Sequence, residues 1–346
     1  MPSGGYPTRR GLLASAGALS LAATTRGRAA ELRPLRIGYV PVIGAAALFV
    51  MDGAGWAREA GLDLKAAKFD SGPAAIQAFA SGTLDALAIG VAPVAVAHSK
   101  GANISVVSAA GLGGSSFVAV PDLASGITSD PASIAAAFAA FRKANGRRAK
   151  VATLPAGGVP TVALSYWLNK VGHVDPADVE IVTIGIEAAQ LAMLSNAVDA
   201  ATLLEPSATI VLQRNPKLKT VISARDMFPN IPGVVFAVSR RMIAERRDDV
   251  QALVNLVIRA TGLIKAKPEE AAPYVAKILG GGLVEPDVMR RAMISRAVEY
   301  VVDPRDIMQS TKAMLEYQAS IGDFATAPPV EGLFDLSFYD AAKKPR

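Results

Sequence analysis

The amino-acid sequence predicts an α/β protein, and three observations support this. Short apolar runs alternate with Ala-rich helical segments from Leu35 onward, the pattern of βα units that build a largely parallel sheet. The chain has 346 residues, which is enough for two domains. Residues 75–86 and 189–200 match in their second halves, which indicates two lobes of like topology.

Each strand is expected where a short apolar run ends in turn-forming residues. In residues 35–40, Leu35, Ile37 and Tyr39 alternate with polar or small residues, which is the period of a strand. The expected strands span 35–40, 62–69, 86–89, 104–108, 117–120, 150–154, 180–184, 200–204, 220–223 and 234–238.

Helices are expected where proline or a capping residue opens a run and glycine closes it. The expected helices span 45–60, 73–81, 91–100, 131–145, 161–169, 187–194, a run after Pro206, and most of 240–321. The Pro-containing tail after residue 321 is expected to pack as an irregular strap.

The internal match is closest in residues 81–86 (SGTLDA) and 195–200 (SNAVDA). In each copy a helix is expected to end at Gly82 or Asn196, because both residue types tolerate the left-handed conformation. Coincidence in an Ala-rich chain is the alternative interpretation. We expect two lobes whose equivalent loops face one cleft, with crossings between lobes at 121–130 and 229–233.

The composition excludes several kinds of chemistry. The chain has no cysteine, so it has no disulfide, thiolate zinc site or cysteine nucleophile. It has two histidines, His98 and His173, and neither is expected to be catalytic. The patterns G-x-S-x-G, Walker A and H-E-x-x-H are absent. We expect no catalytic residue, no metal and no cofactor.

Residues 1–29 are expected to be a Tat-type signal peptide. Arg9 and Arg10 precede an apolar stretch and the small-residue exit Gly27-Arg28-Ala29. The alternative interpretation of this segment is an ordinary Ala-rich helix that follows two arginines in the sequence. The apolar stretch falls short of the roughly 20 residues that span a bilayer. Without these residues the formal charge falls from +6 to +2, and no basic stripe with aromatics remains, so nucleic acid is not an expected partner.

A strand, a loop of small residues and a helix N-terminus follow one another repeatedly along the chain. Ligands of open α/β sheets bind outside the carboxyl ends of strands. Free N–H groups at helix N-termini attract anions, and glycine lets a ligand approach the backbone. These loops therefore predict a binding site made mostly of backbone.

The order of four motifs carries a family resemblance: LRIGY (35–39), GWAREAGLDLK (55–65), SGTLDALAIGVAP (81–93) and SNAVDAATLLEPSA (195–208). Over residues 33–320 the chain resembles periplasmic solute-binding proteins of the nitrate/sulfonate/taurine class, which serve ABC importers. The resemblance implies a type II periplasmic-binding-protein fold with a two-segment hinge. Lobe 1 would comprise 30–121 and 231–346, and lobe 2 would comprise 122–230. It also implies a periplasmic monomer, a small solute and an ABC permease at the inner membrane.

The resemblance places ligand contacts on the same loops. The implied residues are Val42, Ile43, Gly44, Ser71, Gly72, Gly90, Val91, Ala92, Ser115, Ser116, Gly158, Val159, Pro160, Thr161, Glu187 and Glu205. Thr161 would donate to an anion. Glu205 would accept from an amine or amide, or else cap its own helix, and Ser71 would contact the solute or cap its helix.

The loops depart from the family pattern, because they contain no Lys or Arg. This argues against a small inorganic anion such as nitrate and favours an organic molecule with an apolar body. We expect a sulfonate-like, taurine-like or related organic anion. Two alternatives stay open: a periplasmic sensing domain for a receptor, and an enzyme on the same fold. The related pyrimidine-synthesis enzymes use a cysteine-rich motif, which this chain lacks.

Overall fold

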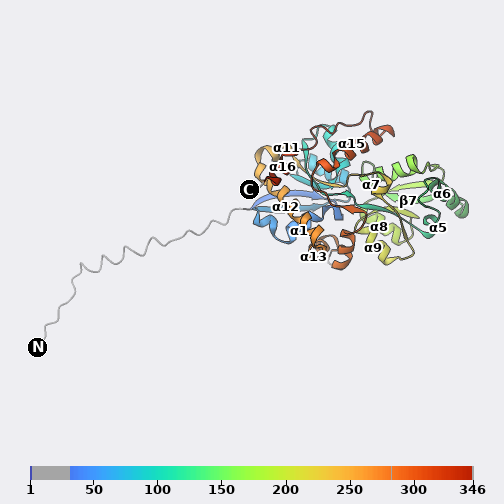
Figure 1. Cartoon of the computed structure of the whole chain (residues 1–346), viewed down its shortest axis with the longest axis horizontal. Coiled ribbons are helices and arrows are strands. Elements are labelled where there is room, and N and C mark those ends of the chain that lie inside the picture. The colour runs from blue at the N-terminus through green and yellow to red at the C-terminus, as the bar shows by residue number, and fades with distance from the viewer. Residues whose placement is uncertain (2–31, 282, 345–346) are drawn as a thin grey trace.

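The computed structural model describes Met1 and residues 32–281 and 283–344. The expected signal peptide, apart from Met1, lies outside the described residues. Two five-stranded sheets, each covered by helices, lie side by side along the long axis of the molecule (Figure 1). We call the unit that contains β1 the first lobe and the unit that contains β7 the second lobe.

The sheet of the first lobe has the order β2-β1-β3-β11-β4. Its strands are β1 (Arg33–Tyr39), β2 (Leu62–Lys68), β3 (Ala86–Gly90), β4 (Ile104–Ala109) and β11 (Val234–Ser239). The first three are parallel, while β11 runs antiparallel to both β3 and β4. Strands β3 and β4 are almost wholly buried and mostly apolar because helices cover both faces of the sheet.

The sheet of the second lobe has the equivalent order β8-β7-β9-β6-β10. Its strands are β6 (Ser115–Ala119), β7 (Ala149–Thr153), β8 (Val179–Thr183), β9 (Ala200–Leu204) and β10 (Lys219–Ser223). Strands β7, β8 and β9 are parallel, and β6 runs antiparallel to β9, as β11 does to β3. The like topology expected from the internal match is therefore present.

The boundary expected at residue 121 is wrong. Strand β6 pairs with β9 and β10, so residues 115–119 belong to the second lobe and not to lobe 1. The chain crosses between β4 and β6, and the turn-rich segment 121–130 instead starts with the short helix α5 (Pro121–Ala124), which packs on β6 and β10. The return path lies between β10 and β11 and includes 229–233. The turn-forming residues in 121–130 therefore belong to a bend within the second lobe and not to the crossing between the lobes.

The helices of the first lobe come from both ends of the described chain. They are α1 (Ala46–Gly53), α2 (Trp56–Glu59), α3 (Gly72–Ala80), α4 (Val91–Ser99), α11 (Arg240–Glu245), α12 (Arg247–Ala266), α13 (Pro268–Leu279), α14 (Pro286–Met293), α15 (Arg305–Ser320) and α16 (Ser337–Lys343). The single helix expected for 45–60 is interrupted, because Gly55 adopts a φ of 77°.

The helices of the second lobe cover its sheet in the same way. Besides α5 they are α6 (Ala132–Asn145), α7 (Val159–Tyr166), α8 (Ile186–Leu194), α9 (Ser207–Arg214) and α10 (Ala224–Met227), and a π-helical turn (Trp167–Val171) continues α7. No helix in the described part of the chain is both long and apolar enough to cross a membrane.

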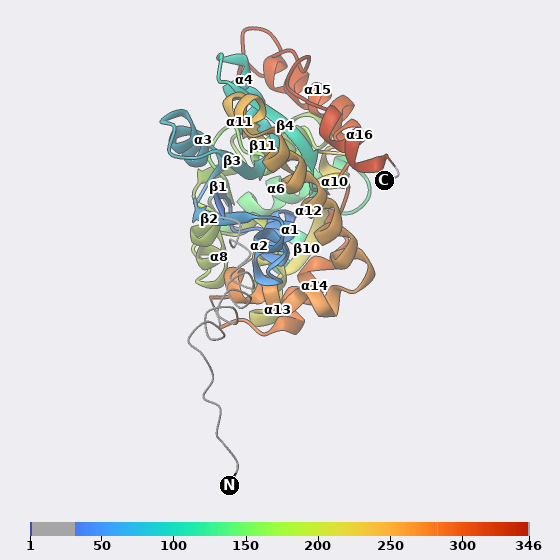
Figure 2. The same ribbon diagram turned by 90° about the vertical axis from the view of Figure 1, so that its left-hand side faces the viewer.

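The C-terminal segment links the two lobes a third time. Helix α14 packs on α9, and α15 contacts both α4 and α7. Between them, β12 (Val298–Glu299) pairs with β5 (Leu112–Gly113) at the first crossing. Figure 2 shows α13 and α14 at the bottom of the view and α15 and α16 at its upper right. The tail expected to be irregular throughout ends in α16, because Phe338 is fully buried against α12.

Candidate functional site

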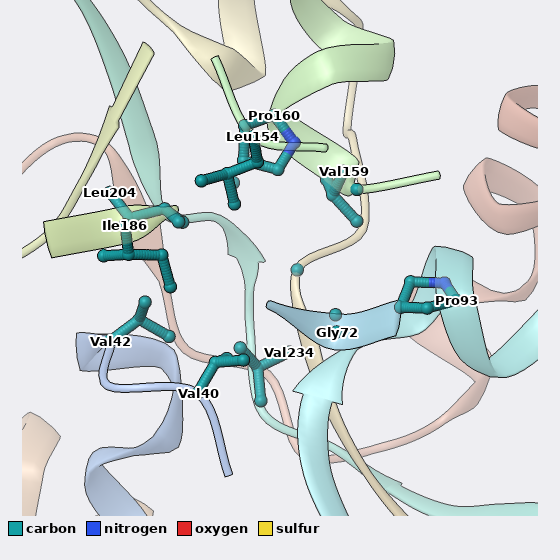
Figure 3. A pocket seen from close by; sticks show the side chains of 14 residues that line it. Val40, Val42, Gly72, Pro93, Leu154, Val159, Pro160, Ile186, Leu204 and Val234 are labelled. Atoms are coloured by element: carbon teal, nitrogen blue, oxygen red, sulfur yellow. The ribbon is translucent and has the colours of Figure 1, made fainter. Parts of the chain in front are cut away.

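A cavity of about 50 Å³ lies between the two lobes. The first lobe contributes Val40, Val42, Gly72, Gly90, Pro93, Gly233 and Val234, the crossing contributes Gly113, and the second lobe contributes Leu154, Gly158, Val159, Pro160, Ile186 and Leu204. In Figure 3, Val40, Val42 and Val234 face Leu154, Pro160 and Ile186 across the opening. Both lobes thus form opposite walls of one cavity.

The elements that carry these residues explain why they meet. Val40, Gly90, Leu154 and Leu204 stand at or just after the carboxyl ends of β1, β3, β7 and β9. Four helices, α3, α4, α7 and α8, each place a residue of their first turn in the lining. Since the carboxyl ends of parallel strands share one sheet edge, the two sheets present their ligand-binding edges to each other.

Direct contacts between the lobes close the cavity. The backbone N–H of Ile43 donates to the carbonyl of Glu205 at 2.8 Å. Lys68 at the end of β2 pairs with Glu187 in the first turn of α8, with 2.7 Å between Nζ and Oε1. A Cβ on Gly90 would stand 3.2 Å from Cγ2 of Val159, so the absence of a side chain there permits this close approach.

Part of the expected ligand-contact set lines this cavity. Val42, Gly72, Gly90, Gly158, Val159 and Pro160 are in its lining. Ile43, Gly44, Val91 and Ala92 are neighbours of lining residues but do not reach it themselves, and Ser115 and Ser116 are buried in β6. A Cβ on Gly44 would collide with Val234, so Gly44 serves packing between the first loop and β11.

Two expected polar contacts have partners inside the protein instead. Thr161 Oγ1 donates to the carbonyl of Leu154 at 2.6 Å, which ties the start of α7 to its own loop rather than facing an anion. Ser71 Oγ accepts the N–H of Ala74 at 3.4 Å and so caps α3. Thr161 lines a separate cavity of about 310 Å³ within the second lobe, between α7 and β8.

Glu205 also has an internal role. Its Oε2 accepts the N–H of Thr209 at 3.1 Å and the Thr209 hydroxyl at 2.8 Å, so it caps α9. The residue is buried, and this burial raises the pKa of Glu205, with hydrogen bonds from Ser295 and Thr209 only partly opposing the rise. Of the two roles left open by the sequence, the structure shows the capping role.

Several lining residues were not expected from the sequence: Val40, Pro93, Gly113, Leu154, Ile186, Leu204, Gly233 and Val234. Val40, Leu154 and Leu204 are the last residues of expected strands, so a rule that counts the last strand residue would have found these three. Val234 is different, since it enters the site only because β11 returns from the second lobe to pair with β3.

The site offers shape and apolar contact rather than acid–base chemistry. No Asp, Glu, Lys, Arg or His is among its lining residues. Neither histidine lines it, and His98 is half-buried on α4. Across the described ranges 32–281 and 283–344, no group of three His, Asp or Glu side chains is arranged to hold a metal ion. Such a lining suits the reversible binding of a small solute.

Comparison with protein families gives one match. The family model described as NMT1-like matches residues 28–280. No curated protein sequence matches the chain.

Several solved structures with this fold are those of binding proteins. The chain is similar to the ligand-binding component of an ABC-type import system from Staphylococcus aureus (14% identity, TM-score 0.73, 90% of this chain and 100% of that one). It is similar to the periplasmic nitrate-binding protein NrtA from Synechocystis PCC 6803 (15%, 0.75, 90% and 88%). It also resembles the periplasmic aliphatic sulphonate-binding protein SsuA from Escherichia coli (16%, 0.63, 85% and 95%). The expected type II periplasmic-binding-protein fold is confirmed.

Proposed function

Because this chain belongs to the NMT1-like family, whose model matches residues 28–280, we propose that it is the substrate-binding component of an ABC importer. It captures a small organic solute between its lobes and delivers it to the permease. One observation carries the proposal: the strand ends of both lobes enclose one cavity, and contacts such as Ile43–Glu205 hold the lobes together around it. Hinge motion between lobes would open and close such a site.

The proposal also names the chemical class of solute that should be tested first. A sulfonate-like, taurine-like or related organic anion is suggested by the names of proteins with this fold, which include a nitrate binder and a sulphonate binder. The lining supports an organic solute with an apolar body, since valine, leucine, isoleucine and proline side chains make up its walls.

The remaining parts of the proposal concern the oligomeric state, the lack of catalysis and the location of the protein. It acts as a monomer that binds and releases its solute unchanged, without catalysis and without nucleic acid. It is exported to the periplasm by the twin-arginine route, as the arrangement of Arg9, Arg10 and the following apolar stretch suggests.

Thermal denaturation of the purified protein against a solute panel tests this function. The panel holds taurine, alkane and aromatic sulfonates, aromatic carboxylates, amides, pyrimidines and amino acids. A solute at ~100 times its dissociation constant stabilises the fold by roughly 2.7 kcal/mol. We expect one chemical class to give that shift, with the compound recovered unchanged and a smaller radius of gyration in solution X-ray scattering.

Two results would count against transport. Recovery of a converted compound would indicate an enzyme on the same fold. Solute uptake that is equal in cells with and without the protein would favour a sensing role. Labelled-solute uptake therefore complements the binding measurement.

A further inference from the structure

We infer that the cavity between the lobes selects an uncharged solute and discriminates against anions. This inference rests on the proposed function, since it concerns the solute of that same site, and it replaces the organic anion suggested by the names of similar proteins with a neutral organic solute. It is carried by the helix N-termini, the backbone donors and the side chains around the cavity, which together leave little that binds negative charge.

Proline occupies the first turn of three of the four helices that face the cavity. Pro73 is the second residue of α3, Pro93 the third of α4, and Pro160 the second of α7. The first turn of a helix has free N–H groups that bind anions, and a proline there removes one of them. The rings of Pro93 and Pro160 line the cavity, so an apolar group stands where a donor would otherwise be.

The fourth helix, α8, has no proline but begins with an acid. Glu187 is in its first turn, next to the lining residue Ile186. A carboxylate at this position already compensates the positive end of the helix dipole. Lys68 pairs with Glu187 at 2.7 Å, so this N-terminus offers a bound anion no unpaired positive charge.

Several backbone donors beside the cavity are used within the protein, although the N–H groups of Gly72, Val159 and Ile186 are not among them. The N–H of Val91 donates to Gly233 at 3.0 Å, and that of Gly158 donates to Pro155 at 3.1 Å. Further pairs are Ile43 N to Glu205 O, Gly233 N to Gly111 O and Gly113 N to Ile231 O. A solute would have to compete with these hydrogen bonds to obtain the same donors.

Side chains do not supply the missing positive charge. Lys68 stands across from Glu187 and is engaged with it at 2.7 Å, and no cationic side chain lines the cavity. Moving an ionised group out of water without a partner is far more costly than moving an amide or hydroxyl. The lining therefore favours a compact solute with a branched or ring-shaped apolar body and neutral polar groups.

Matched pairs of solutes that share one body test the inference by calorimetric titration of the purified protein. The pairs are benzenesulfonamide and benzenesulfonate, benzamide and benzoate, and isovaleramide and isovalerate. We expect the neutral member to bind at least tenfold more tightly in any pair that binds. Tighter binding of the anionic member overturns the inference and leaves the proposed function standing. Binding of no member, together with no thermal shift across the wider panel, overturns both.

Proline variants test the cause. Pro93→Ala and Pro160→Ala restore an N–H at the cavity, and the readout is the ratio of anion affinity to neutral affinity within a pair. The loss of a ring affects both members alike, whereas the new donor favours the anion, so we expect this ratio to rise about fivefold or more. Pro286→Ala is the control, because Pro286 opens α14 away from the cavity and is exposed. An unchanged ratio in both cavity variants contradicts the inference.

Discussion

Asp85 and Asp199 bridge neighbouring strands in the same way in the two lobes. Asp85 accepts the backbone N–H of Arg36 at 3.1 Å and holds the Arg36 guanidinium at 2.7 and 2.9 Å. Asp199 accepts the backbone N–H of Lys150 at 2.8 Å and the guanidinium of Arg147 at 2.6 and 2.8 Å. The aspartates repeated in the two sequence segments therefore stabilise equivalent strand junctions and are not part of the binding site.

The Asp199→Asn variant should lose about 2 kcal/mol of unfolding free energy at pH 7. Burial raises the pKa of Asp199, but hydrogen bonds from Arg147 and from the Lys150 N–H outweigh burial, so the pKa lies below its ordinary value. Hydrogen bonds to a charged group contribute ~1.5–3 kcal/mol, and the half-exposed Arg147 regains water when the charge is lost. Urea denaturation measures the difference.

The pH dependence of this difference has a defined sign. A carboxyl group with a depressed pKa contributes stability above its unfolded pKa of about 3.9, and that contribution is lost as pH falls through the folded pKa. The gap between the wild-type protein and Asp199→Asn should therefore close in acid. Glu316→Gln, an exposed site on α15, serves as control and should show no gap. A gap of constant size from pH 7 to pH 3 would contradict this account.

The Glu205→Gln variant should gain stability relative to wild type as pH rises. Burial raises the pKa of Glu205, so its contribution to stability is present below the unfolded pKa of about 4.3 and is lost as pH rises through the folded pKa. Glutamine keeps an oxygen acceptor for Thr209 without the cost of a buried charge. Thermal denaturation between pH 4 and pH 8 measures the difference.

A measurement of solute affinity distinguishes the role of Glu205 as a helix cap from a role in contacting the solute. Because its carboxylate caps α9 and is not in the cavity lining, Glu205→Gln should leave solute affinity within about twofold of wild type. A loss of tenfold or more would show that Glu205 contacts the solute.

The sequence predicted the sheets better than it predicted the lobe boundary. Alternation, proline and glycine located nearly all strands to within two residues, and Gly82 and Asn196 adopt positive φ values of 78° and 57° as expected. The return of β11 to the first lobe was predicted, but the place of β6 in the second lobe was not. Strand pairing between residues far apart in the sequence leaves no local pattern. The same reason hid Val234, which reaches the cavity through the pairing of β11 with β3.

The candidate site was predicted at the level of loops and less well at the level of side chains. Small residues such as Gly90 and Gly158 indicated close backbone approach and do line the cavity. Thr161 and Ser71 bond to nearby backbone groups, a common use of hydroxyls at helix starts, and neither lines the cavity, so their solute contacts stay predictions. The residue type alone does not distinguish a cap from a ligand contact.

The Gly90→Ala variant should weaken solute binding about five- to tenfold with little change in stability. Gly90 has a φ of −57°, so alanine causes no backbone strain, but the new Cβ would stand 3.2 Å from Val159 Cγ2 on the other lobe. The lobes must separate slightly to accept it, and a small displacement in a packed interface is costly. Calorimetric titration measures the affinity.

A second substitution tests whether Val159 is the cause. The Cβ of Val159 would stand 4.0 Å from the new methyl, which is ordinary contact, so Val159→Ala in the Gly90→Ala background should restore part of the affinity. Gly262→Ala, in open space on α12, is the matched control and should raise stability by about 1 kcal/mol without changing affinity. Additive losses in the double variant would exclude the proposed clash.

Lys68→Met and Glu187→Gln should weaken solute binding by up to about fivefold at low salt and hardly at all at high salt. The pair joins β2 to α8 across the two lobes, so it stabilises the closed arrangement, yet the side chains are 47% and 63% exposed. Exposed ion pairs contribute ~0.2–1 kcal/mol and are screened by salt. Lys65→Met, which breaks a pair with Asp63 within β2, is the control and should leave affinity unchanged at any salt concentration. A loss that persists at high salt in Lys68→Met alone would mean that Lys68 contacts the solute directly, and would contradict both the role of this pair and the inferred preference for uncharged solutes.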